Sequence, residues 1–388
     1  MSRFLQLHLL TSYPPANLNR DDLGRPKTAK MGGSDRLRVS SQSLKRAWRT
    51  SDLFQSALQG AMGERTKLLG VQLFLSLIEK HVDFKMAVDT AGKLAGVFGK
   101  NEAPDDLKKK KDPEKQALYA KLQKKWRGWN QQNLGIAEYS LEQLNELQKI
   151  EISQLAFVSP EEKQKVFELV DLVASGGELG EKLDILCDTT SAVDVALFGR
   201  MLADHPSKNI EAACQVAHAI SVHPITIEDD YFTAVDDLNS GHEDAGAAHI
   251  GETGFAAGLF YSYICINKEL LVENLNGDKT LASRAIAALV EAAAKVAPEG
   301  KQNSFASRAY ASYVLAEAGD QQPRSLSVAF LKPVGRQIDD YQTAAIEMLN
   351  RQQQNFDQVY GDCADARYAI NAVTGEGSLK ELLAFASK

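Results

Sequence analysis

Apolar and polar residues alternate in residues 4–10 (FLQLHLL), where a glutamine and a histidine fall between leucines. This period of two predicts a β-strand. Residues 12–33 are polar and rich in Pro, Asn and Gly, and they predict a loop. The apolar period then becomes that of a helix, with Ser40 or Ser41 placed to cap a helix that runs into the early fifties. The chain is therefore expected to begin with a strand, a loop and an amphipathic helix.

Residues 55–195 show a helical and irregular pattern that differs from the sheet-forming pattern around them. An apolar segment, a lysine-rich segment and two amphipathic segments each predict a helix, at residues 68–82, 104–126, 140–150 and 159–175. We interpret this block as a helical insertion.

Strand patterns return at residues 216–225 and 255–266, on either side of a polar stretch much longer than a tight hairpin turn. The rest of the chain predicts an amphipathic helix, a fourth strand, a weaker strand signal and a helical tail, at residues 281–296, 310–316, 326–331 and 337–360. Thr280 is the expected cap of the first of these helices.

This order of elements, with the insertion set aside, is the β-α-β-β-α-β order of an α+β, ferredoxin-like fold. RNA-recognition modules share that topology, but so do many enzymes, so the fold alone does not assign a function.

Composition places the chain among soluble globular proteins, because 44% of its 388 residues are hydrophobic and 24% are charged. The sequence contains no run of about 18 apolar residues and no secretory layout at its N-terminus, so we expect a cytoplasmic protein that does not enter a membrane. The 4 Cys and 7 His residues lack the spacing of a metal site. We therefore expect reduced thiols, no metal and no cofactor.

Charge is distributed unevenly along the chain, whose formal net charge is −7. Residues 20–49 contain nine Lys or Arg against three Asp, and residues 100–127 contain ten Lys or Arg against five acids. Residues 226–245 contain seven acids and no Lys or Arg. A basic cluster in an acidic chain favours an anionic partner.

The predicted helix that starts near Ser41 concentrates part of this basic cluster on one face. At about 100° per residue, that face carries Gln42, Lys45, Arg46 and Arg49. The opposite face carries Leu44, Ala47 and Trp48, which we expect in the core. The helix N-terminus adds amide donors suited to phosphate. The pattern by itself is compatible with a nucleic-acid backbone site and with cations that are merely solvated.

Several short motifs, in their order along the chain, resemble the CasC family, the backbone subunit of the CRISPR Cascade complex of type I-E systems. They are LNRDD (18–22), GG (32–33), VSSQSLKRAWR (39–49), ALFGRM (196–201), AHAI (217–220), DDYFTAVDDL (229–238) and AHIG (248–251). The match is good near the N-terminus and at residues 190–305, and it is loose in the insertion and the last eighty residues.

The resemblance implies a hand-shaped subunit with a modified RNA-recognition-module palm, a helical fingers insertion and a long thumb hairpin. Their expected bounds are 1–58 and 194–388 for the palm, 59–193 for the fingers and 225–257 for the thumb. Copies of the chain would form a filament along the spacer of a guide RNA (crRNA), together with other Cascade subunits. Each copy would displace one base, so that the remaining bases can pair with target DNA.

The resemblance also implies roles for individual residues. Guide phosphates and sugars would be held by Arg20, Lys27, Ser40, Gln42, Lys45, Arg46 and Arg49. Met201 would insert between bases, and the thumb residues Phe232, Thr233 and Ile250 would pack on the displaced base. Lys301 is a weaker candidate for contact with the RNA backbone.

Two other functions are compatible with parts of the sequence. The acidic side chains of the thumb segment could bind Mg²⁺ and cleave RNA, and they are Glu228, Asp229, Asp230, Asp236 and Asp237. The resemblance argues against this alternative, because type I-E systems leave cutting to a separate nuclease, and we therefore expect no enzyme activity and no catalytic residue. The remaining alternative is a structural adaptor that binds no nucleic acid.

Overall fold

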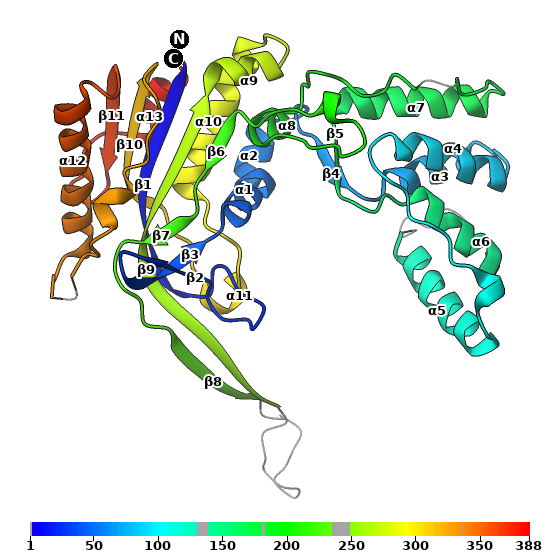
Figure 1. Ribbon diagram of the computed structural model, residues 1–388, viewed down its shortest axis with the longest axis horizontal. Coiled ribbons are helices and arrows are strands. Elements are labelled where there is room, and N and C mark those ends of the chain that lie inside the picture. Colours follow the sequence, from blue (N-terminus) through cyan, green and yellow to red (C-terminus); the bar gives the residue numbers. More distant parts are fainter. Residues whose placement is uncertain (1, 130–138, 181–182, 235–248, 336) are drawn as a thin grey trace, which may run out of the picture. The chain divides into compact units, whose positions relative to one another are not determined.

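The structure is a computed structural model that describes residues 2–129, 139–180, 183–234, 249–335 and 337–388 (Figure 1). It is a mixed α/β chain with a large antiparallel sheet. The chain divides into two compact units. Unit 1 comprises Met1–Gln59, Ala213–Glu273 and Gly277–Lys388, and unit 2 comprises Gly60–Ala212 and Asn274–Asn276.

The sheet of unit 1 is built around two long neighbouring strands, β1 (Phe4–Ala16) and β9 (His249–Asn267). The main path of the sheet runs β11-β10-β1-β9-β7-β3-β2, and β6 and β8 also pair with β9. The other strands are β2 (Thr28–Met31), β3 (Ser34–Val39), β6 (Cys214–Val216), β7 (Ala219–Ser221), β8 (Glu228–Ala234), β10 (Ala311–Gly319) and β11 (Ala366–Asn371).

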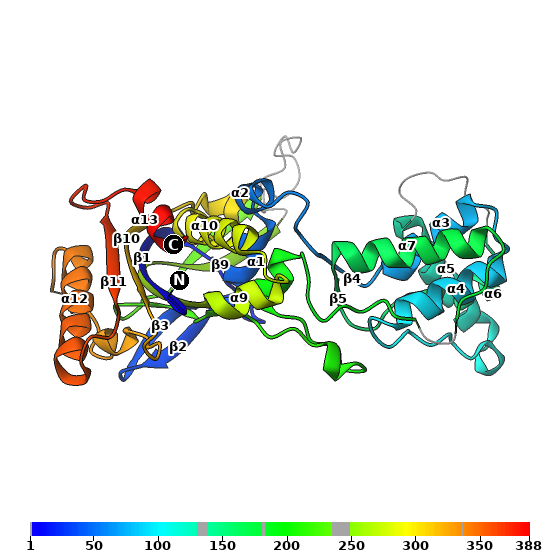
Figure 2. The ribbon, with the colours of Figure 1, turned by 90° about the horizontal axis from the view of Figure 1, so that it is seen from above.

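Helices cover both faces of this sheet. Figure 2 shows α10 (Lys279–Lys295), α13 (Leu379–Ala386) and α2 (Asp52–Ala57) together on one face, and α1 (Ser41–Thr50) also contacts α10. On the other face, α12 (Tyr341–Tyr360) and the 3₁₀ turn η4 (Ser327–Phe330) pack against apolar residues of β1, β9 and β10. The short helices α9 (Lys268–Asn274) and α11 (Gln302–Phe305) flank α10 in the sequence.

A buried polar cluster lies within the sheet of unit 1. His8 Nε2 lies 3.0 Å from Glu317 Oε2, and its Nδ1 lies 2.9 Å from the Tyr261 hydroxyl. Arg324 and Arg367 donate to the same Glu317 carboxylate. Burial alone would raise the pKa of Glu317, but its hydrogen bonds with His8, Arg324 and Arg367 hold that pKa far below its usual value. Burial lowers the pKa of His8 in spite of the neighbouring carboxylate, so the imidazole is neutral.

Unit 2 is mainly helical and has its own apolar core. Its helices are α3 (Leu69–Glu79), α4 (Phe84–Gly96), α5 (Asp112–Trp129), α6 (Leu141–Glu146), α7 (Pro160–Ala174) and α8 (Val193–Phe198). The 3₁₀ turns η1 (Leu107–Lys109), η2 (Leu147–Ile150) and η3 (Pro206–Lys208) connect them, and β4 (Glu64–Thr66) pairs with β5 (Ala156–Val158). Each of the four segments expected to be helical contains a helix, but α5 begins only at Asp112, and α4 is a further helix that the sequence analysis did not specify.

The sequence analysis places the end of the insertion at residue 193, whereas unit 2 continues to Ala212. The extra residues belong to this unit because their side chains pack inside it. Val195 and Ile210 form a small apolar cluster with Ala192, and Arg200 forms a buried ion pair with Glu162. Part of the predicted thumb, residues 235–248, lies outside the described residues.

For several elements, the structure differs from the sequence-based prediction in bounds, type or cap. Residues 12–33 are not one loop, because β1 continues to Ala16 and β2 forms at Thr28–Met31. The expected strand at residues 216–225 is two short strands, β6 and β7. The weak strand signal at 326–331 is the 3₁₀ turn η4. Asp278, rather than Thr280, caps α10, because its carboxylate accepts the N–H of Leu281 at 2.8 Å.

Candidate nucleic-acid interface

The N-terminus of α1 is held by side chains from its own cap and from a preceding loop. Ser40 Oγ accepts the N–H of Ser43 at 3.3 Å, and the Ser40 N–H donates to Asn19 Oδ1 at 2.9 Å. The Asn19 carbonyl accepts the Lys27 N–H at 2.8 Å. These bonds bring the residues around Arg20 beside the start of the helix.

The predicted division of α1 into an apolar and a basic face is confirmed. The apolar side chains Leu44, Ala47 and Trp48 are at most 5% exposed. On the other face, the exposed side chains are Gln42 and Arg46, and the half-buried ones are Lys45 and Arg49. The burial of Trp48 and its neighbours therefore orients the polar face outward.

His218 lies against the first turn of α1, and the sequence analysis assigned it no role. The Ser41 N–H donates to His218 Nδ1 at 3.1 Å, and Arg38 Nη1 lies 3.5 Å from the same nitrogen. Burial lowers the pKa of His218, and the positive charges of Arg38 and Lys27 lower it further. The imidazole is thus neutral and accepts a hydrogen bond at a spot where two cations and a helix N-terminus meet. His218 lies in the AHAI motif (217–220), which is the feature of the sequence that could have pointed to it.

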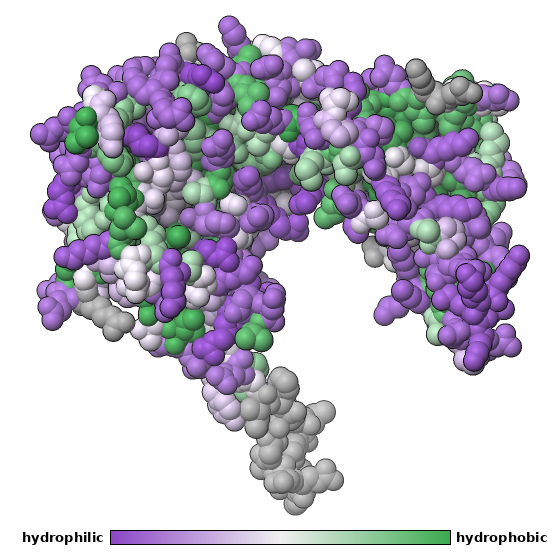
Figure 3. Space-filling view, in the orientation of Figure 1, coloured by the Kyte–Doolittle hydropathy of each residue, from purple (hydrophilic) through white to green (hydrophobic). Residues whose placement is uncertain are grey.

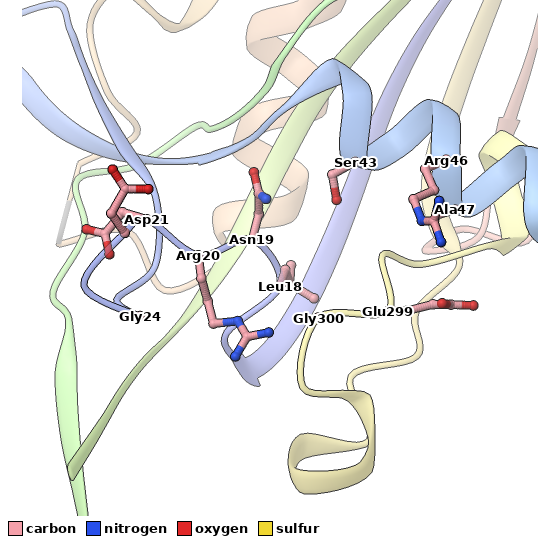
Figure 4. Close-up of a pocket in the computed structure, with 11 residues that line it drawn as sticks. Leu18, Asn19, Arg20, Asp21, Gly24, Ser43, Arg46, Ala47, Glu299 and Gly300 are labelled. Carbon is pink, nitrogen blue, oxygen red and sulfur yellow. The ribbon is translucent and has the colours of Figure 1, made fainter. Parts of the chain in front are cut away.

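A groove of about 520 Å³ opens beside α1 (Figure 4). Figure 4 shows the Arg20 guanidinium on one side of the groove and that of Arg46 on the other, with Ser43 above them on α1. Glu299 and Gly300 line the same groove. Neither Arg20 nor Arg46 forms an ion pair with any carboxylate in the described part of the chain. These two guanidinium groups are therefore available to an anionic ligand, although Asp21 and Asp22 also line the groove.

The loop that carries Arg20 is rigidly built. The Asp21 carboxylate accepts the N–H groups of Leu23 and Arg25, each at 2.9 Å. The fully buried Asn17 donates to the carbonyls of Gly24 and Gly254, at 2.8 and 2.9 Å. The sequence analysis did not foresee Asn17, whose role depends on contacts with β9.

Lys301 directly follows Gly300, which lines the groove, but its amine forms a hydrogen bond with Thr253, outside the groove lining. A Cβ atom on Gly300 would lie 2.1 Å from the Leu18 carbonyl oxygen, so only glycine allows the backbone to approach the segment after β1 this closely. Lys301 itself has a φ of +46°. Its Nζ donates to Thr253 Oγ1 at 2.9 Å.

The described part of the predicted thumb is the β8–β9 ladder, which pairs Phe232 with Gly251 and Thr233 with Ile250. Phe232 is 43% exposed. A Cβ atom on Gly251 would lie 2.4 Å from Phe232 Cζ, which shows that the aromatic ring lies over the bare backbone of Gly251. Glycine at this position therefore lets the ring lie close to the opposite strand.

Met201 belongs to unit 2 and is 81% exposed, while both of its neighbours are anchored. Arg200 exchanges backbone hydrogen bonds with Ile210, and the Leu202 N–H donates to Asn209 Oδ1 at 2.6 Å. The buried Arg200 guanidinium lies 2.6 Å from the Glu162 carboxylate. The fixed backbone thus presents an apolar side chain to solvent, and an insertion of this side chain between bases stays a prediction.

Arg36 was counted in the basic cluster of residues 20–49, and the structure corrects this placement. The side chain is fully buried, and its guanidinium donates to the carbonyls of Ser221 at 2.9 Å and Phe330 at 3.0 Å. Arg36 ties β3 to β7 and η4 and is not available to a ligand.

The lysine run of unit 2 is partly neutralised within the unit. Lys109 pairs with Asp106 at 3.1 Å, and Lys110 pairs with Asp105 at 3.0 Å. Figure 3 shows hydrophilic side chains over the outer end of this unit, around α5. The exposed cations there include Lys121, Lys124 and Arg127.

Of the acidic residues proposed for metal binding, Asp229 forms an ion pair with Arg25 at 2.9 Å, and Asp236 and Asp237 lie outside the described residues. Within the described ranges, no three His, Cys, Asp or Glu side chains are grouped as metal ligands would be. The cysteines are free thiols. No helix in those ranges has the length and apolar character needed to cross a membrane.

A family model described as "CT1975-like protein" matches residues 5–384. Among solved structures, a chain of a "CRISPR RNA-guided surveillance complex, pre-nicking" is 28% identical, with a TM-score of 0.74, and the match covers 99% of this chain and 100% of that chain. A chain of a "CRISPR RNA-guided surveillance complex" is 25% identical, with a TM-score of 0.56 and 99% of each chain covered. No curated protein sequence matches the chain.

Proposed function

The chain belongs to the CT1975-like protein family, and from this premise we propose that it is a non-catalytic backbone subunit of a type I-E-like CRISPR Cascade complex in the cytoplasm. The observation that carries this proposal is the similarity, over nearly the whole of both chains, to a chain of an RNA-guided surveillance complex. In this role several copies assemble along the spacer of one guide RNA, beside other Cascade subunits, and leave most bases free to pair with target DNA.

The groove beside α1 supplies a physical reason for guide binding. Arg20 and Arg46 reach it from separate segments, and neither forms an ion pair with a carboxylate of the described residues, although three acids line the same groove. Cationic contacts to phosphates give affinity without reading sequence, as a subunit that must accept any spacer requires. The proposed backbone contacts are Arg20, Lys27, Ser40, Gln42, Lys45, Arg46 and Arg49, with Lys301 reaching RNA only if it leaves Thr253.

The fold supports the proposed hand-shaped organisation. The strand order β10-β1-β9-β6 has the neighbours expected of a ferredoxin-like palm. Unit 2 supplies the proposed fingers, and the β8–β9 ladder supplies the proposed thumb. Phe232, Thr233 and Ile250 would pack on the displaced base, and Met201 would insert between bases.

Expression together with the neighbouring genes of its operon, followed by purification, tests the proposed function. We expect the complex to retain RNA of one discrete length, visible as a high ratio of absorbance at 260 nm to that at 280 nm. Protein free of nucleic acid would favour the adaptor alternative. RNA that shortens when Mg²⁺ is added would favour the nuclease alternative.

Replacing the exposed thumb aromatic, Phe232→Ala, is expected to change base displacement more than guide affinity. A single stacking contact contributes about 1–3 kcal/mol per base, while phosphate contacts supply most of the affinity. Chemical probing of the bound guide should therefore lose its periodic pattern of exposed bases. The matched control is Tyr231→Ala, because alternation along β8 places this exposed aromatic on the opposite face of the ladder. An unchanged periodic pattern in the Phe232 variant would contradict the assigned role.

A further inference from the structure

The groove beside α1 is lined by three acids, Asp21, Asp22 and Glu299, which a purely phosphate-binding surface would not need. Glu299 lines the groove together with Arg20 and Arg46, and its side chain is exposed. In the described part of the chain it forms no ion pair with either arginine. Figure 4 shows its carboxylate below the Arg46 guanidinium, at the edge of the groove. A negative charge there weakens phosphate binding, so its presence calls for a different ligand group.

The backbone that carries Glu299 is held in place. Gly300 packs so closely on Leu18 that an added Cβ would lie 2.1 Å from the Leu18 carbonyl oxygen. The Glu299 carbonyl accepts the Gln302 N–H at 3.2 Å. The backbone that carries the carboxylate is thus anchored against Leu18, two residues after the end of β1.

An ionised carboxylate only accepts hydrogen bonds, so it needs a donor. Along an RNA strand, anionic phosphates alternate with neutral sugars whose 2′-hydroxyl is a hydrogen-bond donor, whereas DNA has no such donor. A groove that holds two guanidinium groups and, beside one of them, the Glu299 carboxylate offers partners for both the phosphates and the sugars of such a strand. On DNA, the same carboxylate would lose water without gaining a hydrogen bond.

We propose that Glu299 selects ribose over deoxyribose by accepting a hydrogen bond from a guide 2′-hydroxyl while Arg20 and Arg46 bind the flanking phosphates. The inference rests on the proposed guide-binding function and adds to it a residue that determines the sugar specificity. Ser43 lines the same groove, but its neutral hydroxyl can instead donate to a phosphate oxygen, and it is a weaker acceptor than a carboxylate. In Asp21, the Oδ1 atom already accepts two backbone N–H groups, so this oxygen is not free to accept a sugar hydroxyl.

The test compares short labelled oligonucleotides of one sequence with 2′-hydroxyl, 2′-deoxy or 2′-fluoro sugars, titrated against the full chain. The 2′-fluoro sugar keeps the RNA-like pucker but has no proton to donate. We expect the wild-type protein to bind the ribo-oligonucleotide about tenfold more tightly than either analogue, as for one charge-assisted hydrogen bond. In Glu299→Ala this preference should disappear, chiefly because binding of the two analogues improves once the negative charge is removed.

The matched control is Asp22→Asn, which removes one negative charge from the same groove and should keep the sugar preference. Equal binding of the ribo- and 2′-fluoro-oligonucleotides by the wild-type protein would overturn the proposal, because sugar pucker would then explain selectivity. A preference that persists in Glu299→Ala, or that also vanishes in Asp22→Asn, would overturn it as well. Failure of the wild-type protein to bind any of the oligonucleotides would instead remove the guide-binding function itself, and the inference with it.

Discussion

Reversing both groove arginines, Arg20→Glu with Arg46→Glu, is expected to weaken guide-RNA binding roughly 100-fold or more at about 0.15 M salt. Both guanidinium groups line one groove, and neither is paired with a carboxylate of the described residues. The double variant removes two phosphate contacts and adds two repulsive charges. The measurement is a titration of labelled single-stranded RNA at several salt concentrations.

The salt dependence distinguishes lost phosphate contacts from general damage. Each contact to a single strand contributes about 0.7 to the slope of log K against log salt, so losing two should reduce the slope by about 1.4. The fold should survive, because α1 is held by Leu44, Ala47 and Trp48 on its buried face. A matched double reversal, Arg351→Glu with Lys380→Glu, changes the net charge equally at exposed positions on α12 and α13. Equal loss of affinity in both double variants would show that the groove is not the binding site.

Removing the charge at the centre of the buried cluster, Glu317→Gln, is expected to lower the free energy of unfolding by about 3–5 kcal/mol. The Glu317 carboxylate is fully buried and accepts hydrogen bonds from His8, Arg324 and Arg367. A neutral amide leaves the Arg324 guanidinium without its anion, and it leaves Arg367 with Asp357 as its remaining carboxylate partner. Chemical denaturation measures the change, and Glu291→Gln is the control, since its partly exposed i, i+4 pair with Lys295 should contribute only about 0.3–0.5 kcal/mol.

The same cluster predicts the direction of the pH dependence. The pKa of Glu317 is lowered in the folded chain, so its contribution to stability is present above its ordinary pKa of 4.5 and is lost as the pH falls further. The pKa of His8 is also lowered from 6.5, so the folded state loses stability once the pH falls below that value. The wild-type free energy of unfolding should therefore fall in two steps on acidification, and Glu317→Gln should flatten the lower one. If Glu317→Gln lowered the free energy of unfolding by less than about 1 kcal/mol at neutral pH, the cluster would not stabilise the fold as a buried ion network does.

The elements that the sequence predicts well are those with a strong local pattern. The helical period of residues 41–50 determines which face of α1 is buried, because Leu44, Ala47 and Trp48 recur at the spacing of one helix face. Ser159, Pro160 and Glu162 predict the start of α7, where the structure shows a capping box. The apolar runs of β1, β9 and β10 are recognised for the same reason, since buried strands are apolar along their length.

The elements that the sequence misses have weak or mixed local patterns. β2 and β11 carry half-exposed side chains at the edges of the sheet, so their hydrophobic alternation is faint. In the sequence, Arg36 is indistinguishable from the surface cations of a basic stretch. Its burial depends on two carbonyls, on β7 and η4, that accept hydrogen bonds from its guanidinium.

By itself, the sequence determined the basic face of α1 and the division into an α+β part and a helical insertion, because these follow from periodicity and composition within one segment. Only the tertiary structure decided that Arg20 and Arg46 share a groove with Glu299, that His218 meets the N-terminus of α1, and that Asn17 ties its loop to β9. These arrangements bring together segments up to 279 residues apart in the numbering, as for Arg20 and Glu299. They depend on strand register and on close backbone approach, as at Gly300, which no local pattern of residues encodes.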